Sequence, residues 1–118
     1  MQKHENADIV EFSESINDIK IIFTLQKDSV CTSLEILHPY GSFYINANQG
    51  DNLIKALRNG GNVNPGDNGG ESIVVEISDN IHISLDCYGA HSSKILLPLE
   101  IQDMLSEIEV IYNALHVF

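Results

Sequence analysis

Four side chains between residues 76 and 86 are of types that catalyse reactions or bind metals. His82, Ser84 and Asp86 are the residue types of a nucleophilic triad, and they occupy alternate positions of one predicted strand. Alternate residues of a strand lie about 6.8 Å apart along one face, which is too far for the direct hydrogen bonds of a triad. A solvated sheet face explains these residues better than a catalytic site does.

Glu76, His82 and Asp86 could instead form a metal or acid–base site, because the predicted hairpin sets Glu76 directly across from His82. A zinc ion would need further ligands, and the spacing indicates none. The Gly- and Asn-rich stretch at 60–70 lacks the ligand order and the glycine position of an EF-hand. We therefore expect a protein that is not an enzyme and that carries no cofactor and no metal.

The chain is strongly acidic. It has 17 Asp and Glu against 6 Lys and Arg, a formal net charge of −11 over 118 residues. Such a field repels nucleic acids and anionic membranes and attracts basic protein surfaces. The N-terminus has no apolar signal-peptide core, and no later run approaches the roughly 18 apolar residues of a membrane span. We expect a cytoplasmic protein whose partner is a protein, with no nucleic acid and no membrane bound.

Alternating apolar residues predict a three-stranded antiparallel meander in the first half of the chain. With residues 26–29 as the first loop, Ile21 faces Leu34, and both apolar sets lie on one side of the sheet. The following turn then sets Ile36 opposite Phe43.

A hairpin is predicted in the second half. A two-residue turn would set Glu76 opposite Ile83, whereas a three-residue loop aligns Val75 with Ile83 and Glu76 with His82. Because it pairs apolar with apolar residues, the longer loop is favoured. Residues 95–97 add a further short strand.

Three helices complete the predicted fold: an amphipathic one in the first 18 residues, one at 51–58, and one from Pro98 to about residue 116. The stretch 60–70 has too many turn formers for regular structure and is predicted as a flexible loop. The fold class is α+β, an antiparallel sheet of meander plus hairpin with helices, in the order α-β-β-β-α-β-β-(β)-α. We expect one domain over residues 1–118.

This order of elements, in an acidic chain of this length, resembles the class I type III secretion chaperones. The resemblance is one of pattern over nearly the whole chain. Its most telling segments are Leu53-Ile54-Lys55-Ala56-Leu57, Asn64-Pro65-Gly66-Asp67-Asn68-Gly69-Gly70, Ile81-His82-Ile83-Ser84-Leu85 and Leu97-Pro98-Leu99. It implies a homodimeric cytosolic bacterial chaperone that holds the N-terminal segment of an effector in extended form and needs no nucleotide. In that family the middle helix and a neighbouring strand commonly form the dimer contact, which maps here to Leu53, Ile54 and Leu57.

Apolar side chains outside the main core would contact such a partner. By alternation Ile22, Leu37 and Tyr44 project to the opposite face of the sheet, and Ile9 and Phe12 belong to the predicted first helix. For each of them, coverage by a second layer of the same subunit is an equally good explanation.

An inhibitor of the immunity or antitoxin type, which binds a basic toxin such as a nuclease, is the second interpretation. A stable dimer with an extended segment favours the chaperone, and a monomer that caps a folded basic protein favours the inhibitor. An enzyme is the third class, and it requires that Glu76, His82 and Asp86 line a pocket. The acidic surface of the C-terminal helix fits partner steering and plain solubility equally well.

Overall fold

Strands account for most of the regular structure. The computed structural model describes residues 1–63, 71–87 and 91–116, and within them the chain forms nine strands, two α-helices and one short 3₁₀ helix. The predicted α+β class is confirmed, although the chain begins with strands. The elements in chain order are β1 (Gln2–Glu5), β2 (Ile9–Ile16), β3 (Ile19–Gln26), β4 (Thr32–His38), β5 (Gly41–Ala47), α1 (Gly50–Asn59), β6 (Gly61–Val63), β7 (Glu71–Ile77), β8 (Asn80–Cys87), β9 (His91–Pro98), η1 (Leu99–Ile101) and α2 (Gln102–Leu115).

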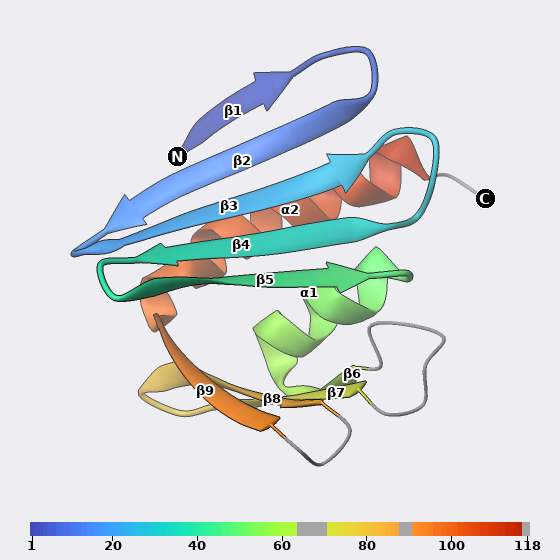
Figure 1. Ribbon diagram of the computed structural model, residues 1–118. Coiled ribbons are helices and arrows are strands. Elements are labelled where there is room, and N and C mark those ends of the chain that lie inside the picture. The colour runs from blue at the N-terminus through green and yellow to red at the C-terminus, as the bar shows by residue number, and fades with distance from the viewer. Residues whose placement is uncertain (64–70, 88–90, 117–118) are drawn as a thin grey trace.

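The strands form two antiparallel sheets in which chain neighbours pair, with the orders β1-β2-β3-β4-β5 and β6-β7-β8-β9. The helix α1 connects the sheets and contacts β4 and β5 on one side and β6 and β7 on the other. The helix α2 packs against α1, and Figure 1 shows it behind the five-stranded sheet. Neither helix of the described chain is long and apolar enough to cross a membrane.

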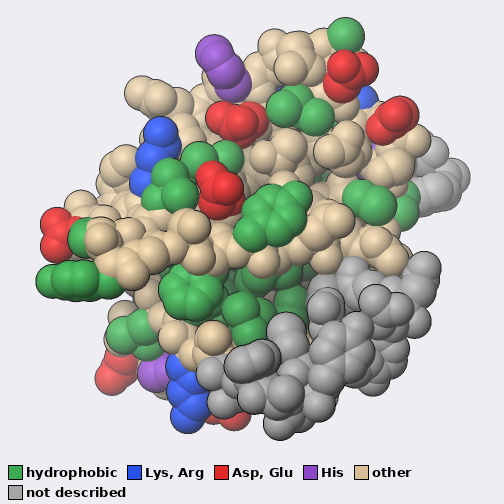
Figure 2. Space-filling model, in the orientation of Figure 1, with side chains coloured by type: hydrophobic (Ala, Val, Ile, Leu, Met, Phe, Trp, Pro, Cys, Tyr) green, Lys and Arg blue, Asp and Glu red, His purple; other side chains and the backbone are tan. Residues whose placement is uncertain are grey.

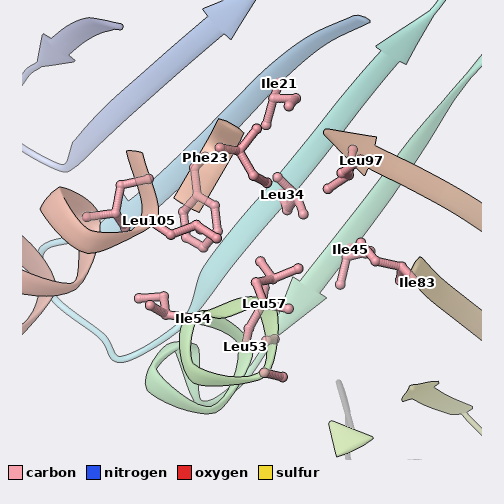
Figure 3. Packing of buried hydrophobic residues seen from close by; sticks show 14 of the residues in the cluster. Ile21, Phe23, Leu34, Ile45, Leu53, Ile54, Leu57, Ile83, Leu97 and Leu105 are labelled. Carbon is pink, nitrogen blue, oxygen red and sulfur yellow. The ribbon is translucent and has the colours of Figure 1, made fainter. Parts of the chain in front are cut away.

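One hydrophobic core spans both sheets and both helices. Because strand side chains alternate, Phe23 of β3 and Leu34 of β4 lie opposite each other on the inner face and are fully buried. Leu57 of α1 and Leu105 of α2 come in from the helices, and Ile83 comes in from the four-stranded sheet (Figure 3). Each such side chain contributes roughly 1.5–3 kcal/mol when it is removed from water.

The helix predicted at the N-terminus is wrong, because that segment forms strands β1 and β2. The spacing of Ile9, Phe12 and Ile16 fits a helix, but Val10 and Phe12 also alternate along a strand. Pairing with β3 buries both of them. In the two-residue turn that follows, Asn17 takes a positive φ of 55°, which tight hairpins require.

The registers predicted for β4–β5 and β7–β8 are confirmed, and the predicted helix at 51–58 lies within α1. The β3–β4 register is shifted by two residues, since Ile21 lies opposite Ile36 and not opposite Leu34. The cause is the connection between the paired residues Leu25 and Thr32, which runs over residues 26–31 and is two residues longer than the predicted loop at 26–29. A shift of two leaves every side chain on its predicted face.

Elements after α1 also differ from the prediction. The predicted loop at 60–70 begins with strand β6, and residues 64–70 lie outside the described part of the chain. The short strand at 95–97 is part of the longer β9. Pro98 ends that strand with a ψ of 142°, so α2 begins only at Gln102, after the 3₁₀ turn η1.

The backbone carbonyl of Val30 joins three elements. It accepts the N–H of Gly50 at the start of α1 (2.8 Å) and the hydroxyl of Tyr112 in α2 (3.1 Å). Nearby, the Gln26 carbonyl accepts from Nε2 of His116 (3.1 Å). Burial raises the pKa of Tyr112, because a phenolate in this place would lose its hydration. The β3–β4 connection thus fixes both helices.

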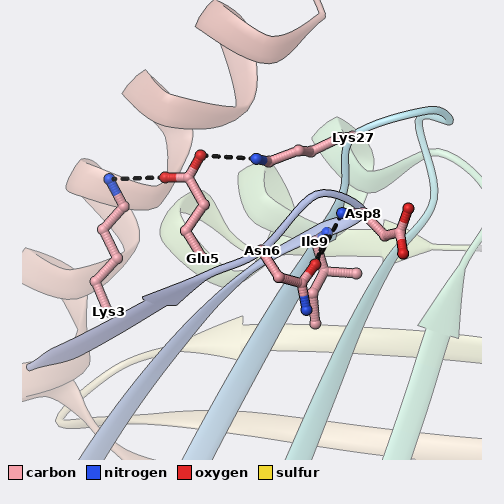
Figure 4. Close-up of polar contacts among 6 residues, drawn as sticks. All are labelled: Lys3, Glu5, Asn6, Asp8, Ile9 and Lys27. Atoms are coloured by element: carbon pink, nitrogen blue, oxygen red, sulfur yellow. Dashed lines mark hydrogen bonds and ion pairs between the residues drawn. The ribbon is translucent and has the colours of Figure 1, made fainter.

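The edge strand β1 is fastened by polar contacts (Figure 4). The Asn6 side-chain oxygen accepts the N–H groups of Asp8 (2.8 Å) and Ile9 (2.9 Å) in the β1–β2 turn. The Lys27 ammonium donates to the Glu5 carboxylate (2.7 Å). This hydrogen bond and the charge of Lys27 lower the pKa of Glu5.

Thr32 provides a test of the packing under β4. Its side chain is buried beside Gly50, where any Cβ would overlap it, and among the described residues its Oγ1 has no hydrogen-bond partner. A buried hydroxyl without a partner costs free energy, so Thr32→Val should raise the free energy of unfolding by about 1 kcal/mol in urea denaturation. The control Thr24→Val, on the half-exposed outer face of β3, should change it by less. A loss of stability in Thr32→Val would contradict this account.

Tyr112→Phe removes the hydroxyl that donates to Val30 and should lower the free energy of unfolding by about 1 kcal/mol near neutral pH. Since the pKa of Tyr112 is raised in the folded state, its contribution is complete below about pH 10 and is lost as the pH rises further. The stability difference between the two proteins should therefore narrow above pH 10 in denaturation curves. The exposed Tyr44→Phe should show no such change, and a gap that stays constant with pH would refute the assignment.

Candidate functional site

A hollow of about 600 Å³ lies between the end of β2 and the start of α2. Four carboxylates line it, and none of the lining residues that the structure describes is a Lys or Arg. Apolar side chains also line it, among them Ile101 and Met104, which are almost fully buried. We call it the acidic groove, and its residues are Met1, Glu14, Ser15, Ile16, Asn17, Glu100, Ile101, Asp103, Met104 and Glu107.

The acidic groove follows from the sequence of η1 and α2. Glu100, Asp103 and Glu107 are three and four positions apart, so they share one side of the helical segment. The first helical turn favours such carboxylates, because the helix dipole places positive charge there. The β2–β3 hairpin adds Glu14 from the other side.

Negative charge predominates in the acidic groove. Glu14 pairs with the terminal ammonium of Met1 (3.0 Å). The three carboxylates of η1 and α2 have no ion-pair partner in the described part of the chain, whereas Glu109 elsewhere on α2 pairs with Arg58 (3.0 Å). The described residues hold no group of three His, Cys, Asp or Glu able to bind a metal ion. Carboxylates without an ion-pair partner can bind the charged end of a Lys or Arg side chain, and the apolar stem of that side chain can contact the apolar lining residues.

A second hollow, of about 470 Å³, separates the two sheets, and we call it the inter-sheet groove. It is largely apolar, and none of its described lining residues carries a carboxylate. Figure 2 shows hydrophobic side chains gathered in it beneath β5. Its residues are Ile19, Ile36, His38, Tyr40, Gly41, Ser42, Phe43, Lys94, Ile95 and Leu96.

The residues predicted to contact a partner do not form one site. Ile22, Leu37 and Tyr44 lie on the outer face of the five-stranded sheet, as alternation predicts; Tyr44 is 64% exposed and the other two are half-buried. Ile9 is half-buried in β2. Phe12 is fully enclosed in the core, so its side chain is not accessible in this fold.

Leu53, Ile54 and Leu57, the predicted dimer contact, are each 0% exposed. Their side chains face β-sheet residues and α2 of this same chain (Figure 3). A dimer contact through these three side chains would require α1 to leave the core.

The residues considered for catalysis lie on the outer face of the four-stranded sheet. Glu76 is opposite His82, as predicted, and both are exposed. With Ser84 and Lys94 they line a hollow of only about 160 Å³. The side chain of Asp86 lies outside the described part of the structure. The described residues therefore offer a shallow polar surface at this place.

Sequence reasoning missed both grooves. The spacing of the acids at positions 100, 103 and 107 indicates a negative face on the last helix. Because the segment with Glu14 was predicted as a helix, the sequence did not indicate that Glu14 lines the same groove. The inter-sheet groove joins β5 and β9, which are about 50 residues apart in the chain and do not pair. No local pattern could have indicated it.

Comparison with known proteins adds no assignment: no protein-family model, no characterised protein and no solved structure matches this chain. The function has to be inferred from the chemistry of the two grooves.

Proposed function

We propose that this protein is a non-enzymatic protein-binding module that inhibits a basic partner, in the manner of an immunity or antitoxin protein acting on a basic toxin such as a nuclease. The observation that carries the proposal is the acidic groove, where three carboxylates without an ion-pair partner among the described residues lie together with apolar lining residues. A partner would insert Lys or Arg side chains there, with their stems on Ile101 and Met104 and their charged ends at the carboxylates.

The charge of the whole molecule supports the same partner. At −11 the protein attracts basic proteins at long range and speeds their association at low salt. At physiological salt, charges further apart than the Debye length of about 8 Å are largely screened. The acidic groove itself therefore determines which basic surface binds stably.

The secretion chaperone is the alternative to which the resemblance points, and we rank it second. Its expected first helix is replaced by β1 and β2, and the side chains of its expected dimer contact are enclosed in the core. The inhibitor proposal needs neither element.

The proposal predicts that the triple variant Glu100→Gln, Asp103→Asn and Glu107→Gln weakens partner binding by on the order of tenfold or more in Kd, about 1.4 kcal/mol. Its physical cause is the loss of the carboxylates that meet the partner's cations. The protein is used as bait in a lysate of cells that produce it, the retained proteins are identified by mass spectrometry, and Kd is measured by calorimetry with the purified partner.

The control is Asp8→Asn, Asp28→Asn and Asp79→Asn, which removes the same charge from exposed turns outside the acidic groove. It should bind with nearly unchanged Kd. Light scattering should give a complex of one copy with one compact basic protein. Equal binding by both triple variants would overturn the role of the groove, and a dimer that retains an extended segment of a large secreted protein would favour the chaperone.

A further inference from the structure

The strands at the sheet edges differ in their protection against pairing with another chain. An open edge leaves backbone N–H and C=O groups free to pair, and proteins usually block it with charges, Pro or a very short strand. Three edges follow this rule: β1 carries Lys3 and Glu5, β6 has 3 residues, and β9 carries Lys94 and ends at Pro98.

The fourth edge, β5, has none of these devices. Its seven residues, Gly-Ser-Phe-Tyr-Ile-Asn-Ala, include no charge and no Pro, although the chain as a whole is rich in charge. The two-residue turn before it makes His38 and Gly41 a hydrogen-bonded pair, so Ser42, Tyr44 and Asn46 direct their N–H and C=O groups away from β4. These groups lie along an edge of the five-stranded sheet with which no strand of the described residues pairs.

Exposed apolar surface gathers at the same place. Tyr40 in the turn is 93% exposed, Tyr44 on β5 is 64% exposed, and Leu96 on β9 is 50% exposed. Phe43 of β5 is half-buried and lines the inter-sheet groove together with Ile95 of β9. An unprotected edge therefore borders an apolar hollow.

The shape of this region favours a single added strand over a second copy of the protein. Residues of both β5 and β9 line the inter-sheet groove, and Figure 1 shows the four-stranded sheet beyond β5. A strand added to β5 would lie about 4.8 Å from it, within the groove, whereas the whole sheet of a second copy would meet β9.

Charge adds one requirement. Among the described residues, Lys94 is the one Lys or Arg that lines the inter-sheet groove, it has no ion-pair partner, and no carboxylate lines the groove with it. Glu76 and Lys94 both line the smaller hollow on the outer face of the four-stranded sheet, but they form no ion pair. His38 is occupied by its own turn, where Nδ1 accepts the N–H of Tyr40 (3.2 Å). A complementary segment would place a carboxylate at Lys94.

We propose that β5 accepts an extended segment of a partner protein as a sixth strand, with apolar side chains at alternate positions filling the inter-sheet groove and one Asp or Glu beside Lys94. Backbone hydrogen bonds along β5 would supply affinity, and the groove would select the side chains. This site is separate from the acidic groove and does not depend on the function proposed for it.

The test is a selection of random nonapeptides displayed on phage against the whole protein, with counter-selection against Leu96→Glu. Selected peptides should alternate apolar residues and carry one Asp or Glu. Bound peptide should slow hydrogen exchange at the amides of Ser42, Tyr44 and Asn46 by tenfold or more. A failure to enrich such peptides, or protection confined to other strands, would overturn the proposal.

A charge reversal in the protein that is rescued by a charge reversal in the peptide gives a second test. A folding defect would not be rescued in this way. Lys94→Glu should weaken a selected peptide at least tenfold, and exchange of the peptide's acid for Lys should restore binding to that variant. Val110→Glu makes the same kind of change as Leu96→Glu at a side chain that is 68% exposed on α2, and it should bind like the unaltered protein. Lack of rescue by the Lys peptide would refute the contact at Lys94.

Two further outcomes separate the possible occupants. The triple variant of the acidic groove should bind the selected peptides with unchanged Kd, since the two sites are distinct; a loss there would overturn the separation. Protection of the β5 amides that grows with protein concentration in the absence of peptide, together with a dimer in light scattering, would show that a second copy occupies the edge and would also overturn the proposal.

Discussion

The enclosure of α1 between the two sheets is the constraint on which the rest of the structure depends. Leu53, Ile54 and Leu57 are fully buried, and α1 contacts strands of both sheets as well as α2. At roughly 1.5–3 kcal/mol for each buried side chain, these three residues contribute a sum comparable to the net stability of a small domain. Both sheets pack part of their apolar faces against this helix, and α2 packs against it as well.

The same helix sets the position of both grooves. Because α1 occupies the space between the sheets, β5 and β9 stay apart and leave the inter-sheet groove open. At its C-terminal end, the Leu57 carbonyl accepts from the side chain of Gln102 (3.0 Å), and Arg58 pairs with Glu109 (3.0 Å). These contacts fix the first turns of α2, which carry the carboxylates of the acidic groove.

The sequence predicted those parts of the fold that depend on neighbouring residues. The β4–β5 and β7–β8 hairpins and the helix at 51–58 follow from alternation, turn residues and helical spacing, which are local signals. The N-terminal strand was missed because Ile9, Phe12 and Ile16 satisfy a helical spacing, and only the pairing with β3 decides in favour of a strand. The candidate sites were missed for the same kind of reason, since strand order and open edges arise only once the sheets are assembled.

Almost all of the strand pairing joins elements that follow one another in the chain, and such local contacts allow the hairpins to form early in folding. The contacts of α2 are of another kind: His116 bonds to Gln26 across 90 positions, and Tyr112 bonds to Val30 across 82. The strand pairing can therefore form before α2 docks, because α2 bonds to residues that lie more than 80 positions before it. The surface between β2 and α2 depends on these long-range contacts, so it should be among the last parts of the molecule to form during folding.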